Sequence, residues 1–546
     1  MASHAPRNMT DYETTYRSFE WPRPEYFNFS SDVIDRWARE RPDGLALLWS
    51  NEHGQEHQFT WRDVQQGSVA AANALAQLGL GQGDRLFIML PRVPEWWMIV
   101  LGCIRAGVVF MPGTPMLTTK DLRYRLEISN AKAVVTDSES VGKFDELLTG
   151  TSVKHWIVVG AASEPWRSYA DLAQQAAGAS ASFEPTRADD PLLIYFTSGT
   201  TGMPKMVGHT QASYGIGHQI TGKYWLDLTP DDRHLTLSDT GWAKAAWGKL
   251  FGPWSQGACN VVYDFRGRFD APRILELLQN AQVTTFCAPP TAYRALILQD
   301  LTRYDLSAMR HAVSAGEPLN PEVIEVWKKA TGLDIREGYG QTESVVIVGV
   351  FPCMEPRPGA MGRPSPGFDV RVIDDAGVEV PVGQEGDIAV RLAPERPVGL
   401  FERYLNDENA NAVAFRGDWY VTGDRAVQDQ DGYLWFVARA DDVIKTSGYR
   451  VGPFEVESAL LEHAAVAESA VVGVPDERIG QRIKAFVVLK SGFDASAELA
   501  RELQEHCKQI TAPYKYPREI EFVSELPKTV SGKIRRNELR RASGGA

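Results

Sequence analysis

The chain has 546 residues, of which 57 are Lys or Arg and 70 are Asp or Glu, so its formal net charge is −13. This length exceeds one ordinary domain, and 44% apolar with 23% charged residues is typical of a globular protein. The acidic balance argues against nucleic acid or an anionic membrane surface as the main partner. Anionic ligands stay possible, because backbone amides and a few basic side chains can bind phosphate within an acidic protein.

The compartment is predicted from cysteines and from apolar stretches. The most apolar stretch, 96–115, contains Arg105 and Pro112 and is too short to span a bilayer. Residues 1–21 lack an apolar core for secretion, and their acidic residues argue against a mitochondrial transit peptide. We therefore expect a cytoplasmic protein. Scattered cysteines without metal-site spacing indicate free thiols in a reducing compartment: Cys103, Cys259, Cys287, Cys353 and Cys507.

Helical and strand patterns alternate over residues 1–200. Thr60 and Asp63 have the spacing of a capping box, which predicts a helix from there to Gly79. Such alternation is typical of α/β layers around a largely parallel sheet. Further helices are expected at 94–107 and 119–130, and strands at 84–90, 108–111, 133–137 and 155–160.

A change of pattern near residue 440 predicts a domain boundary. The segment 432–450 passes from an aromatic strand into a charged stretch that contains glycine. The residues after it have strand patterns at 469–474 and 484–489 and a helical pattern at 497–510, enough for a small α+β domain. The expected division is a large N-terminal α/β domain of several sheets at 1–438, a linker at 439–442 and a C-terminal domain at 443–546.

The strongest local feature is the sequence LLIYFTSGTTGMPKMV at 192–207. Glycines let the backbone approach a phosphate closely, amides and hydroxyls bind its oxygens, and Lys205 adds a cation. It is not a Walker loop, because Pro204 precedes Lys205 and Met206 follows it. A plain Gly/Thr hairpin turn is the alternative interpretation. The candidate phosphate-binding residues are Thr197, Ser198, Gly199, Thr200, Thr201, Gly202 and Lys205.

Several motifs, taken in order, resemble those of the adenylate-forming superfamily, which includes acyl-CoA synthetases, peptide-synthetase adenylation domains and luciferases. They are YFTSGTTGMPK at 195–205, YGQTE at 339–343, YVTGD at 420–424, ARADDVIKTSGYRV at 438–451 and PKTVSGKIRR at 527–536.

A second set of segments is similar to the medium-chain acyl-CoA synthetases within that superfamily. One segment departs from that group: Gly208-His209-Thr210-Gln211 stands where the group commonly has an acidic residue and a Ser-rich stretch. The similar segments are SDTGWAKAAWGKLFGPWSQGA at 238–258, APPTAYR at 288–294, SAGEPLNPEV at 314–323 and YKYPREIEFV at 514–523.

The resemblance implies that a carboxylate attacks the α-phosphate of ATP and that pyrophosphate leaves. Two anions must approach, so the main tasks are positioning and charge neutralisation. By resemblance, the glycine loop holds the β- and γ-phosphates, Glu343 binds Mg²⁺, and Thr342 contacts the α-phosphate and the acyl carboxylate. Lys533 would be the catalytic lysine that stabilises the developing charge. Taken alone, Glu343 could be a solvated loop carboxylate.

The same resemblance assigns the nucleoside site. Tyr339 would stack on adenine, and Glu337, Gly338, Gly340 and Gln341 beside it belong to the same nucleotide-binding segment.

Two further residues would bind the ribose. Asp424 would accept hydrogen bonds from the ribose hydroxyls, and Arg439 would contact ribose or phosphate. Alternatively, Asp424 is an ordinary turn residue and Arg439 forms a salt bridge with Asp441 or Asp442.

The second half-reaction implies a mobile C-terminal domain that rotates about a hinge, with Asp441 at the hinge position. Ser447, Gly448, Tyr449 and Arg450 would then line the coenzyme A tunnel.

For the acid pocket, Trp242 would form a wall and Gly316 would leave room for an acyl chain. Plain packing is the alternative for both residues.

The expected function is an ATP-dependent ligase. It would activate a medium-chain fatty or aromatic acid as acyl-AMP and form the acyl-CoA thioester, with ATP, Mg²⁺ and coenzyme A as cofactors. Two alternatives stay open: an adenylation enzyme that loads a carrier-protein thiol, and a luciferase-like monooxygenase. A catalytically silent binding protein is disfavoured by Lys533, Glu343 and the intact glycine loop.

Overall fold

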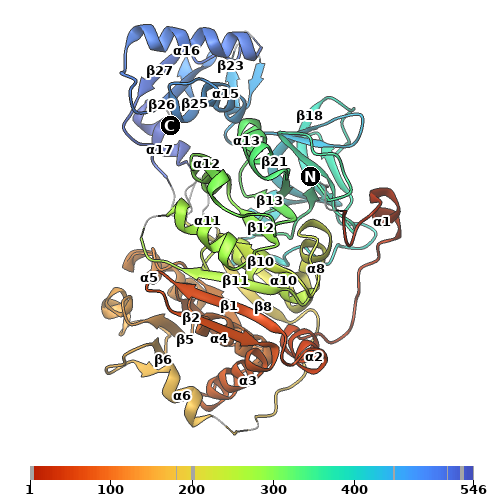
Figure 1. Cartoon of the computed structure of the whole chain (residues 1–546), viewed down its shortest axis with the longest axis vertical. Helices are drawn as coiled ribbons and strands as arrows, with labels where there is room; N and C mark the ends of the chain where they lie inside the picture. Colours follow the sequence, from red (N-terminus) through yellow and green to blue (C-terminus); the bar gives the residue numbers. More distant parts are fainter. Residues whose placement is uncertain are drawn as a thin grey trace.

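The computed structural model describes residues 5–176, 178–179, 181–197, 203–267, 269–446, 449–476, 478–512, 514–528 and 534–544. Within these ranges the strands form three sheets, and the C-terminal sheet with its helices stands apart at one end of the molecule (Figure 1). This arrangement confirms the expected fold class, a large multi-sheet α/β part followed by a small α+β part.

The largest sheet combines a parallel half and an antiparallel half. The parallel pairs are β10 with β11, β10 with β12, β12 with β13, and β13 with β14. The antiparallel pairs include β14 with β15, β15 with β16, β17 with β18, and β21 with β22. Its spatial order is β17 (Val370–Ile373), β18 (Glu385–Arg391), β21 (Trp419–Gln428), β22 (Leu434–Arg439), β16 (Ala360–Pro364), β15 (Val348–Gly349), β14 (Ile335–Tyr339), β13 (His311–Ala315), β12 (Thr285–Ala288), β10 (Arg233–Thr236), β11 (Cys259–Asp264), β1 (Leu45–Asn51) and β2 (Glu56–Thr60), with β20 (Phe415–Arg416) paired to β21.

The second sheet contains the strands predicted near the N-terminus. β3, β4, β5 and β6 run parallel, as the alternating pattern predicts. Two antiparallel strands extend one edge and bring the glycine-loop hairpin into the sheet. The order is β19 (Arg403–Leu405), β9 (Lys205–Thr210), β8 (Pro191–Thr197), β4 (Val109–Pro112), β3 (Arg85–Met89), β5 (Ala133–Asp137), β6 (His155–Val159) and β7 (Arg167–Ser168).

The helix boundaries follow local sequence signals. The predicted capping box of α3 is present: Asp63 N donates to Thr60 Oγ1 at 3.2 Å and Thr60 N donates to Asp63 Oδ2 at 2.8 Å. Gly107 ends α4 with φ 69°, a left-handed value that glycine adopts freely. The N-terminal helices are α1 (Tyr12–Ser18), α2 (Asp35–Glu40), α3 (Trp61–Gln77), α4 (Pro94–Ala106), α5 (Thr119–Ser129) and α6 (Tyr169–Gln175).

The remaining helices of the large part cover the two sheets. A continuous helical segment over residues 243–255 combines α9, the π-helical η4 and α10. The helices are α7 (Gln211–Gly215), α8 (His218–Ile220), α9 (Ala243–Ala245), η4 (Ala246–Phe251), α10 (Gly252–Ser255), α11 (Ala271–Asn280), α12 (Pro290–Ile297), α13 (Pro321–Thr331) and α14 (Glu408–Ala414), with η1 (Phe29–Ile34), η3 (Thr221–Trp225), η2 (Val141–Leu147) and η5 (Leu301–Arg303) as shorter π- and 3₁₀-helical turns.

Tryptophans join the layers of the main core. Trp97 on α4 donates its indole N–H to Lys249 O at 2.7 Å, and Trp254 on α10 donates to Ala46 O at 3.0 Å. Both rings are fully buried. Each ring therefore contributes a large apolar area without leaving its polar N–H unsatisfied.

The C-terminal part has its own core and three helices, α15 (Pro453–Leu461), α16 (Ala497–Ile510) and α17 (Arg536–Ala542). The helix at 497–510 agrees with the sequence prediction. The sheet order is β24 (Tyr449–Val451), β23 (Ile444–Thr446), β26 (Gly480–Leu489) and β25 (Val466–Asp476), with β27 (Glu519–Phe522) beside β26.

The connection to the large part runs from β22, which ends at Arg439, into β23. Asp442 pairs with two arginines of α17, with Arg540 at 3.0 Å and with Arg536 at 3.7 Å. None of the described helices is both long and apolar enough to cross a membrane.

A buried ion-pair cluster fixes the start of β13 to the neighbouring loop. Arg310 Nη1 donates to Asp227 Oδ2 at 2.9 Å, and its Nη2 donates to Asp232 Oδ2 at 2.7 Å. The three side chains are at most 5% exposed. Removal of one partner therefore leaves buried charge without compensation.

We predict that Arg310→Ala lowers the free energy of unfolding by about 3–5 kcal/mol, because Asp227 and Asp232 lose their cation. Arg273→Ala is the matched control, since the Arg273–Glu276 pair is 43% and 47% exposed and should contribute at most about 1 kcal/mol. Denaturant unfolding of both variants gives the comparison. Equal losses would show that the Arg310 cluster does not stabilise the fold.

Candidate active site

The predicted motifs meet where the two large sheets adjoin. Thr197 at the end of β8 pairs with Lys205 at the start of β9, so the glycine loop connects these two strands. In the other sheet, β13 and β14 run parallel with Ala315 opposite Gly338, so Gly316 and Tyr339 leave the same edge of the sheet. The carboxyl edge of parallel strands is the usual position for ligands in α/β folds.

Asp424 is the centre of a polar network. Its Oδ2 accepts hydrogen bonds from Tyr339 Oη and Gln341 Nε2, both at 2.6 Å. Tyr420 Oη in turn donates to Gln341 Oε1 at 2.8 Å. Asp424 lies within β21 and not in a turn, so the turn interpretation is wrong. These hydrogen bonds hold the Asp424 carboxylate, which can only accept hydrogen bonds, at a fixed place beside the YGQTE segment.

Arg439 lies beside this carboxylate because it is the cross-strand partner of Asp424 in β22. Its Nε is 3.8 Å from Asp424 Oδ1 and 3.6 Å from Asp441 Oδ1. Arg439 therefore forms the salt bridge with Asp441 that was considered as an alternative, and it contacts Asp424 as well. The guanidinium is 47% exposed, which leaves its outer face open to a ligand.

Glu343 is buried, at 8% exposure, so the solvated-loop interpretation is wrong. Tyr404 Oη from β19 donates to Glu343 Oε1 at 2.9 Å. Lys205 Nζ lies 4.8 Å from the centre of the Tyr404 ring. Burial raises the pKa of the Glu343 carboxyl. Tyr404 thus joins the glycine-loop lysine to the carboxylate of the YGQTE segment, a contact that sequence reasoning missed.

The main-chain carbonyl of Thr342 is held by one side chain from β9 and one from α7. His209 Nε2 lies 2.7 Å from Thr342 O, and Tyr214 Oη donates to the same oxygen at 2.9 Å. His209 belongs to the segment that departs from the medium-chain pattern. The sequence therefore singled out this position but did not reveal its contact with Thr342.

Glu337 lies two residues before Tyr339 in β14 and is 7% exposed. Its Oε1 accepts a hydrogen bond from Leu319 N at 2.9 Å, while Oε2 is buried without a hydrogen-bond partner in the described ranges. Burial raises the pKa of this carboxyl to about 8. Glu337 is therefore largely neutral at pH 7, unlike an exposed glutamate.

Glycines in and just before the YGQTE segment allow close packing. A side chain at Gly338 would meet the Trp225 ring at 2.4 Å, and one at Gly340 would meet Val345 O at 2.3 Å. Both positions require glycine because larger residues would displace buried neighbours.

The proposed acid-pocket residues lie near a cation. Trp242 is partly exposed and immediately precedes α9. Gly316 has φ +105°, and a Cβ there would lie 2.9 Å from Lys244 Nζ. Lys244 Nζ also donates to Ala315 O. The space beside Gly316 thus faces an ammonium group as well as apolar atoms, and a side chain at this position would be strained whatever the space.

Several predicted residues lie outside the described residues: Ser198, Gly199, Thr200, Thr201, Gly202, Ser447, Gly448 and Lys533. The Arg450 side chain also falls outside, although its backbone pairs with Lys445. Tyr449 is 51% exposed, and its ring stacks on Tyr514 with centroids 4.1 Å apart. Asp441 is exposed, and its carbonyl accepts a hydrogen bond from Arg540 Nη1 at 3.2 Å.

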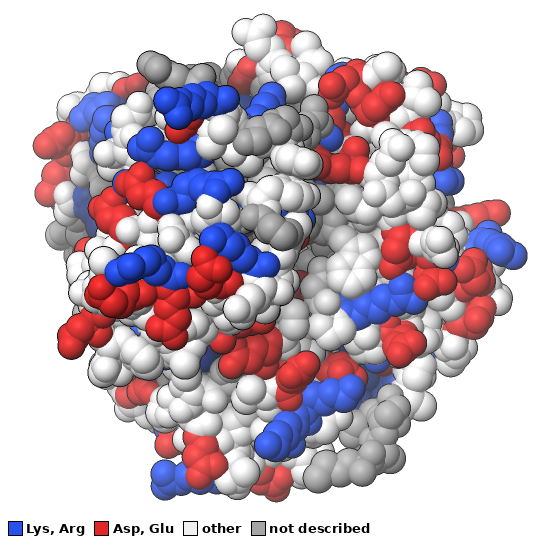
Figure 2. Space-filling model, turned by 90° about the horizontal axis from the view of Figure 1, so that it is seen from above, with Lys and Arg blue, Asp and Glu red and all other residues white. Residues whose placement is uncertain are grey.

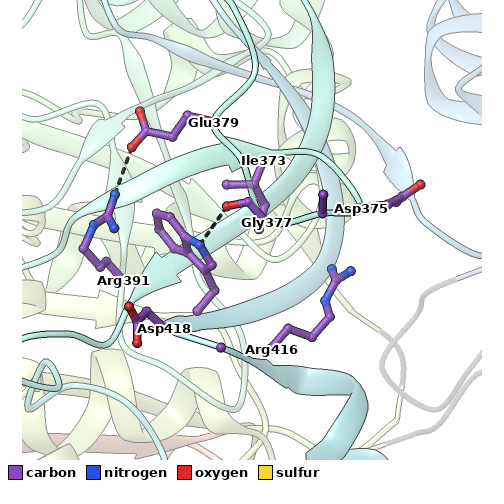
Figure 3. Close-up of a pocket in the computed structure, with 10 residues that line it drawn as sticks. Ile373, Asp375, Gly377, Glu379, Arg391, Arg416 and Asp418 are labelled. Atoms are coloured by element: carbon purple, nitrogen blue, oxygen red, sulfur yellow. Dashed lines mark hydrogen bonds and ion pairs between the residues drawn. The ribbon is translucent and has the colours of Figure 1, made fainter.

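One pocket among the described residues lies elsewhere. It has a volume of about 460 Å³ and opens at the edge formed by β17, β18 and β21. Figure 3 shows one ion pair in its wall, the contact between Arg391 and Glu379 at 2.9 Å. Trp419 in the wall donates to Gly377 O at 3.1 Å. None of the predicted site residues lines it.

Charges of both signs alternate over the face seen from the C-terminal end (Figure 2). In the described ranges, no group of three or more His, Cys, Asp or Glu could hold a metal ion. Mg²⁺ can still be bound by one carboxylate together with substrate phosphates. The Glu343 carboxyl, whose Oε1 is oriented by the Tyr404 hydroxyl, can supply that one carboxylate once it is ionised.

Sequence comparison assigns the family. The AMP-binding enzyme family matches residues 34–405, and the AMP-binding enzyme C-terminal domain matches residues 455–533. The chain belongs to the AMP-binding enzymes. This confirms the resemblance to the adenylate-forming superfamily.

Among related AMP-binding enzymes, the mitochondrial acyl-coenzyme A synthetase ACSM3 of Mus musculus is 47% identical over 546 residues, which cover 98% of this chain and 94% of that protein. The mitochondrial acyl-coenzyme A synthetase ACSM4 of Homo sapiens is 48% identical over 545 residues, covering 98% and 93%. The names of these relatives contradict the cytoplasmic location expected above. That expectation rested on acidic residues near the N-terminus, which do not report where related enzymes work.

Two solved structures of CoA ligases share the fold over most of the chain. The anthranilate CoA ligase AuaEII, solved with anthranoyl-AMP, has a TM-score of 0.88 and 31% identity, covering 95% of this chain and 98% of that one. The benzoate CoA ligase of Burkholderia xenovorans has a TM-score of 0.82 and 29% identity, covering 94% and 100%.

We predict that Glu337→Gln stabilises the protein increasingly as pH rises from about 5 to about 8. The unfolded carboxyl ionises near its ordinary pKa of 4.5 and the folded one near about 8, so wild-type stability falls through this interval. The slope is at most about 1.4 kcal/mol per pH unit. Thermal-unfolding midpoints should diverge in favour of the variant. The same change at exposed Glu325 is the control, and a Glu337→Gln difference that stays constant with pH would contradict the assignment.

Proposed function

We propose that this chain is an ATP-dependent acyl-CoA synthetase that activates a medium-chain fatty or aromatic acid as acyl-AMP and then forms the acyl-CoA thioester. The observation that carries the proposal is the meeting of Lys205, Glu343 and Asp424 at one junction of the two sheets. Lys205 contacts Tyr404, which donates to Glu343, and Gln341 of the same segment donates to Asp424. A triphosphate, its metal and its ribose need these three kinds of group side by side.

Each group has a defined task in the adenylation step. Lys205 and the glycine loop at 197–205 bind the β- and γ-phosphates, and Thr342 orients the α-phosphate and the acid carboxylate. Glu343 would hold Mg²⁺, which neutralises phosphate charge when bound. Asp424 accepts hydrogen bonds from the ribose hydroxyls, and Tyr339 packs against adenine while its hydroxyl stays on Asp424.

The second half-reaction uses the C-terminal part. We divide the chain into an N-terminal domain at 1–438, a hinge at 439–442 and a C-terminal domain at 443–546. In this proposal Lys533 stabilises charge during adenylation and leaves when the domain rotates about Asp441. Residues 447–450 then contact coenzyme A, and the exposed Tyr449 ring offers a flat face for this. Trp242 and Gly316 border the acid, beside Lys244.

A panel of acids tests the proposed function. We expect pyrophosphate release with straight-chain acids of medium length and with benzoate-like acids, and AMP formation that depends on coenzyme A. Turnover only with a carrier-protein thiol would instead support a carrier-loading enzyme, and oxygen-dependent turnover a monooxygenase. If no acid gives pyrophosphate release from ATP, the assignment as an acid-activating enzyme is wrong.

We predict that Tyr404→Phe raises the Mg²⁺ concentration needed for half-maximal adenylation. The variant loses the hydroxyl that orients Glu343, and a hydrogen bond to a charged group contributes about 1.5–3 kcal/mol, or about tenfold to hundredfold. Titration of MgCl₂ at saturating ATP measures the change. Tyr433→Phe is the matched control, because Tyr433 Oη donates to Glu355 O at 2.8 Å away from the motifs. An unchanged Mg²⁺ requirement would mean that Tyr404 does not orient a metal ligand.

A further inference from the structure

His209 is a buried side chain with two polar contacts and no established task. It lies in β9, the strand that begins with Lys205, and it is 1% exposed. Its Nε2 is 2.7 Å from Thr342 O, and its Nδ1 is 3.0 Å from Ser213 Oγ. A carbonyl only accepts, so the proton resides on Nε2 and the Ser213 hydroxyl can donate to Nδ1. Burial lowers the pKa of the imidazole to about 3, which agrees with this neutral tautomer.

Tyr214 reaches the same carbonyl from α7. Its hydroxyl donates to Thr342 O at 2.9 Å, and the rings of His209 and Tyr214 have centroids 3.7 Å apart. Both lone pairs of one main-chain oxygen are thus used by donors from neighbouring elements. Such a fully buried and fully paired arrangement allows one geometry of the Thr342 peptide.

The carbonyl follows a strand of one sheet, whereas its two donors lie in a strand of the other sheet and in the helix directly after that strand. Thr342 follows β14 of the largest sheet, whereas His209 lies in the second sheet, beside the glycine-loop hairpin. The next residue is fixed from the same side, because Phe401 N donates to Glu343 O at 2.7 Å and Tyr404 of β19 pairs with Val207 of β9. β9 and its neighbour therefore hold two consecutive residues of the YGQTE segment.

We propose that His209 and Tyr214 are positioning residues of the adenylation step, which hold Thr342 in register with the glycine loop. The inference rests on the proposed function. Thr342 orients the α-phosphate, and the strand that carries His209 also carries Lys205 at the β- and γ-phosphates. The contact therefore sets the distance between the two ends of the triphosphate. Misplacement by about 1 Å can cost about 100-fold in rate.

The two half-reactions separate this role from a structural one. The β- and γ-phosphates leave as pyrophosphate, so the register between β9 and Thr342 matters for adenylation and not for thioester formation. A variant that merely loosens the fold would slow both steps.

The test compares His209→Leu with His209→Gln, because a glutamine amide can donate to Thr342 O as Nε2–H does and leucine cannot. We expect His209→Leu to slow single-turnover adenylation by about 100-fold. Thioester formation from supplied acyl-AMP and coenzyme A should stay within about twofold of wild type, since that step does not use this register. His209→Gln should recover most of the adenylation rate.

Two further variants keep the experiment decisive. Tyr214→Phe removes only one hydroxyl and should slow adenylation by about threefold to tenfold, even if His209→Leu does not fold. His234→Gln is the control: this histidine is equally buried, but its Nδ1 lies 2.7 Å from Thr285 Oγ1 and its Nε2 lies 2.7 Å from Thr236 Oγ1, not on the motif. It should not separate the half-reactions.

Equal slowing of both half-reactions in folded His209→Leu or Tyr214→Phe would overturn the proposal, as would equal adenylation rates for the Leu and Gln variants at position 209. A wild-type protein that fails to release pyrophosphate with any acid would instead overturn the proposed function.

Discussion

The pairing of β9 with β8 on one side and β19 on the other is the constraint on which the site depends. This pairing places Lys205, His209 and Tyr404 along one edge of the second sheet. From there His209 reaches Thr342 and Tyr404 reaches Glu343, two residues that follow β14 of the largest sheet, while Lys205 lies against the Tyr404 ring. The site forms where this edge meets the YGQTE segment.

The charge balance of the site differs from that of the whole chain. A protein of net charge −13 has to accept a triphosphate at a place that already contains Glu337, Glu343 and Asp424. Burial and an ion pair reduce the negative charge of these three carboxyl groups in different ways. Burial raises the pKa values of Glu337 and Glu343, while Asp424 has Arg439 beside it. The remaining negative potential is what a metal ion and the glycine-loop lysine are suited to offset.

Secondary structure with strong local signals was predictable from sequence. The capping box of α3 and the glycine at the end of α4 define helix ends through neighbouring residues alone, so both predictions are confirmed. The order of strands was not predictable from sequence, because pairing such as β9 with β19 joins residues about two hundred positions apart. Motifs gave Glu343 and Asp424 as candidates, but nothing local revealed that Glu343 is buried or that Tyr404 donates to it. Lys244 was missed for the same reason, since its neighbour Gly316 lies in a distant segment.

The segment between the two parts has very little freedom. Ala440 N donates to Gly423 O at 2.9 Å, which extends the ladder between β21 and β22 by one residue. Asp442 is bound to Arg540 and Arg536 of α17, so it moves with the C-terminal part. Any rotation of that part has to be absorbed by the backbone dihedrals close to Asp441. A joint with so few rotatable bonds would restrict any such rotation to a narrow arc with little sliding, because the C-terminal part stays tethered to the end of β22.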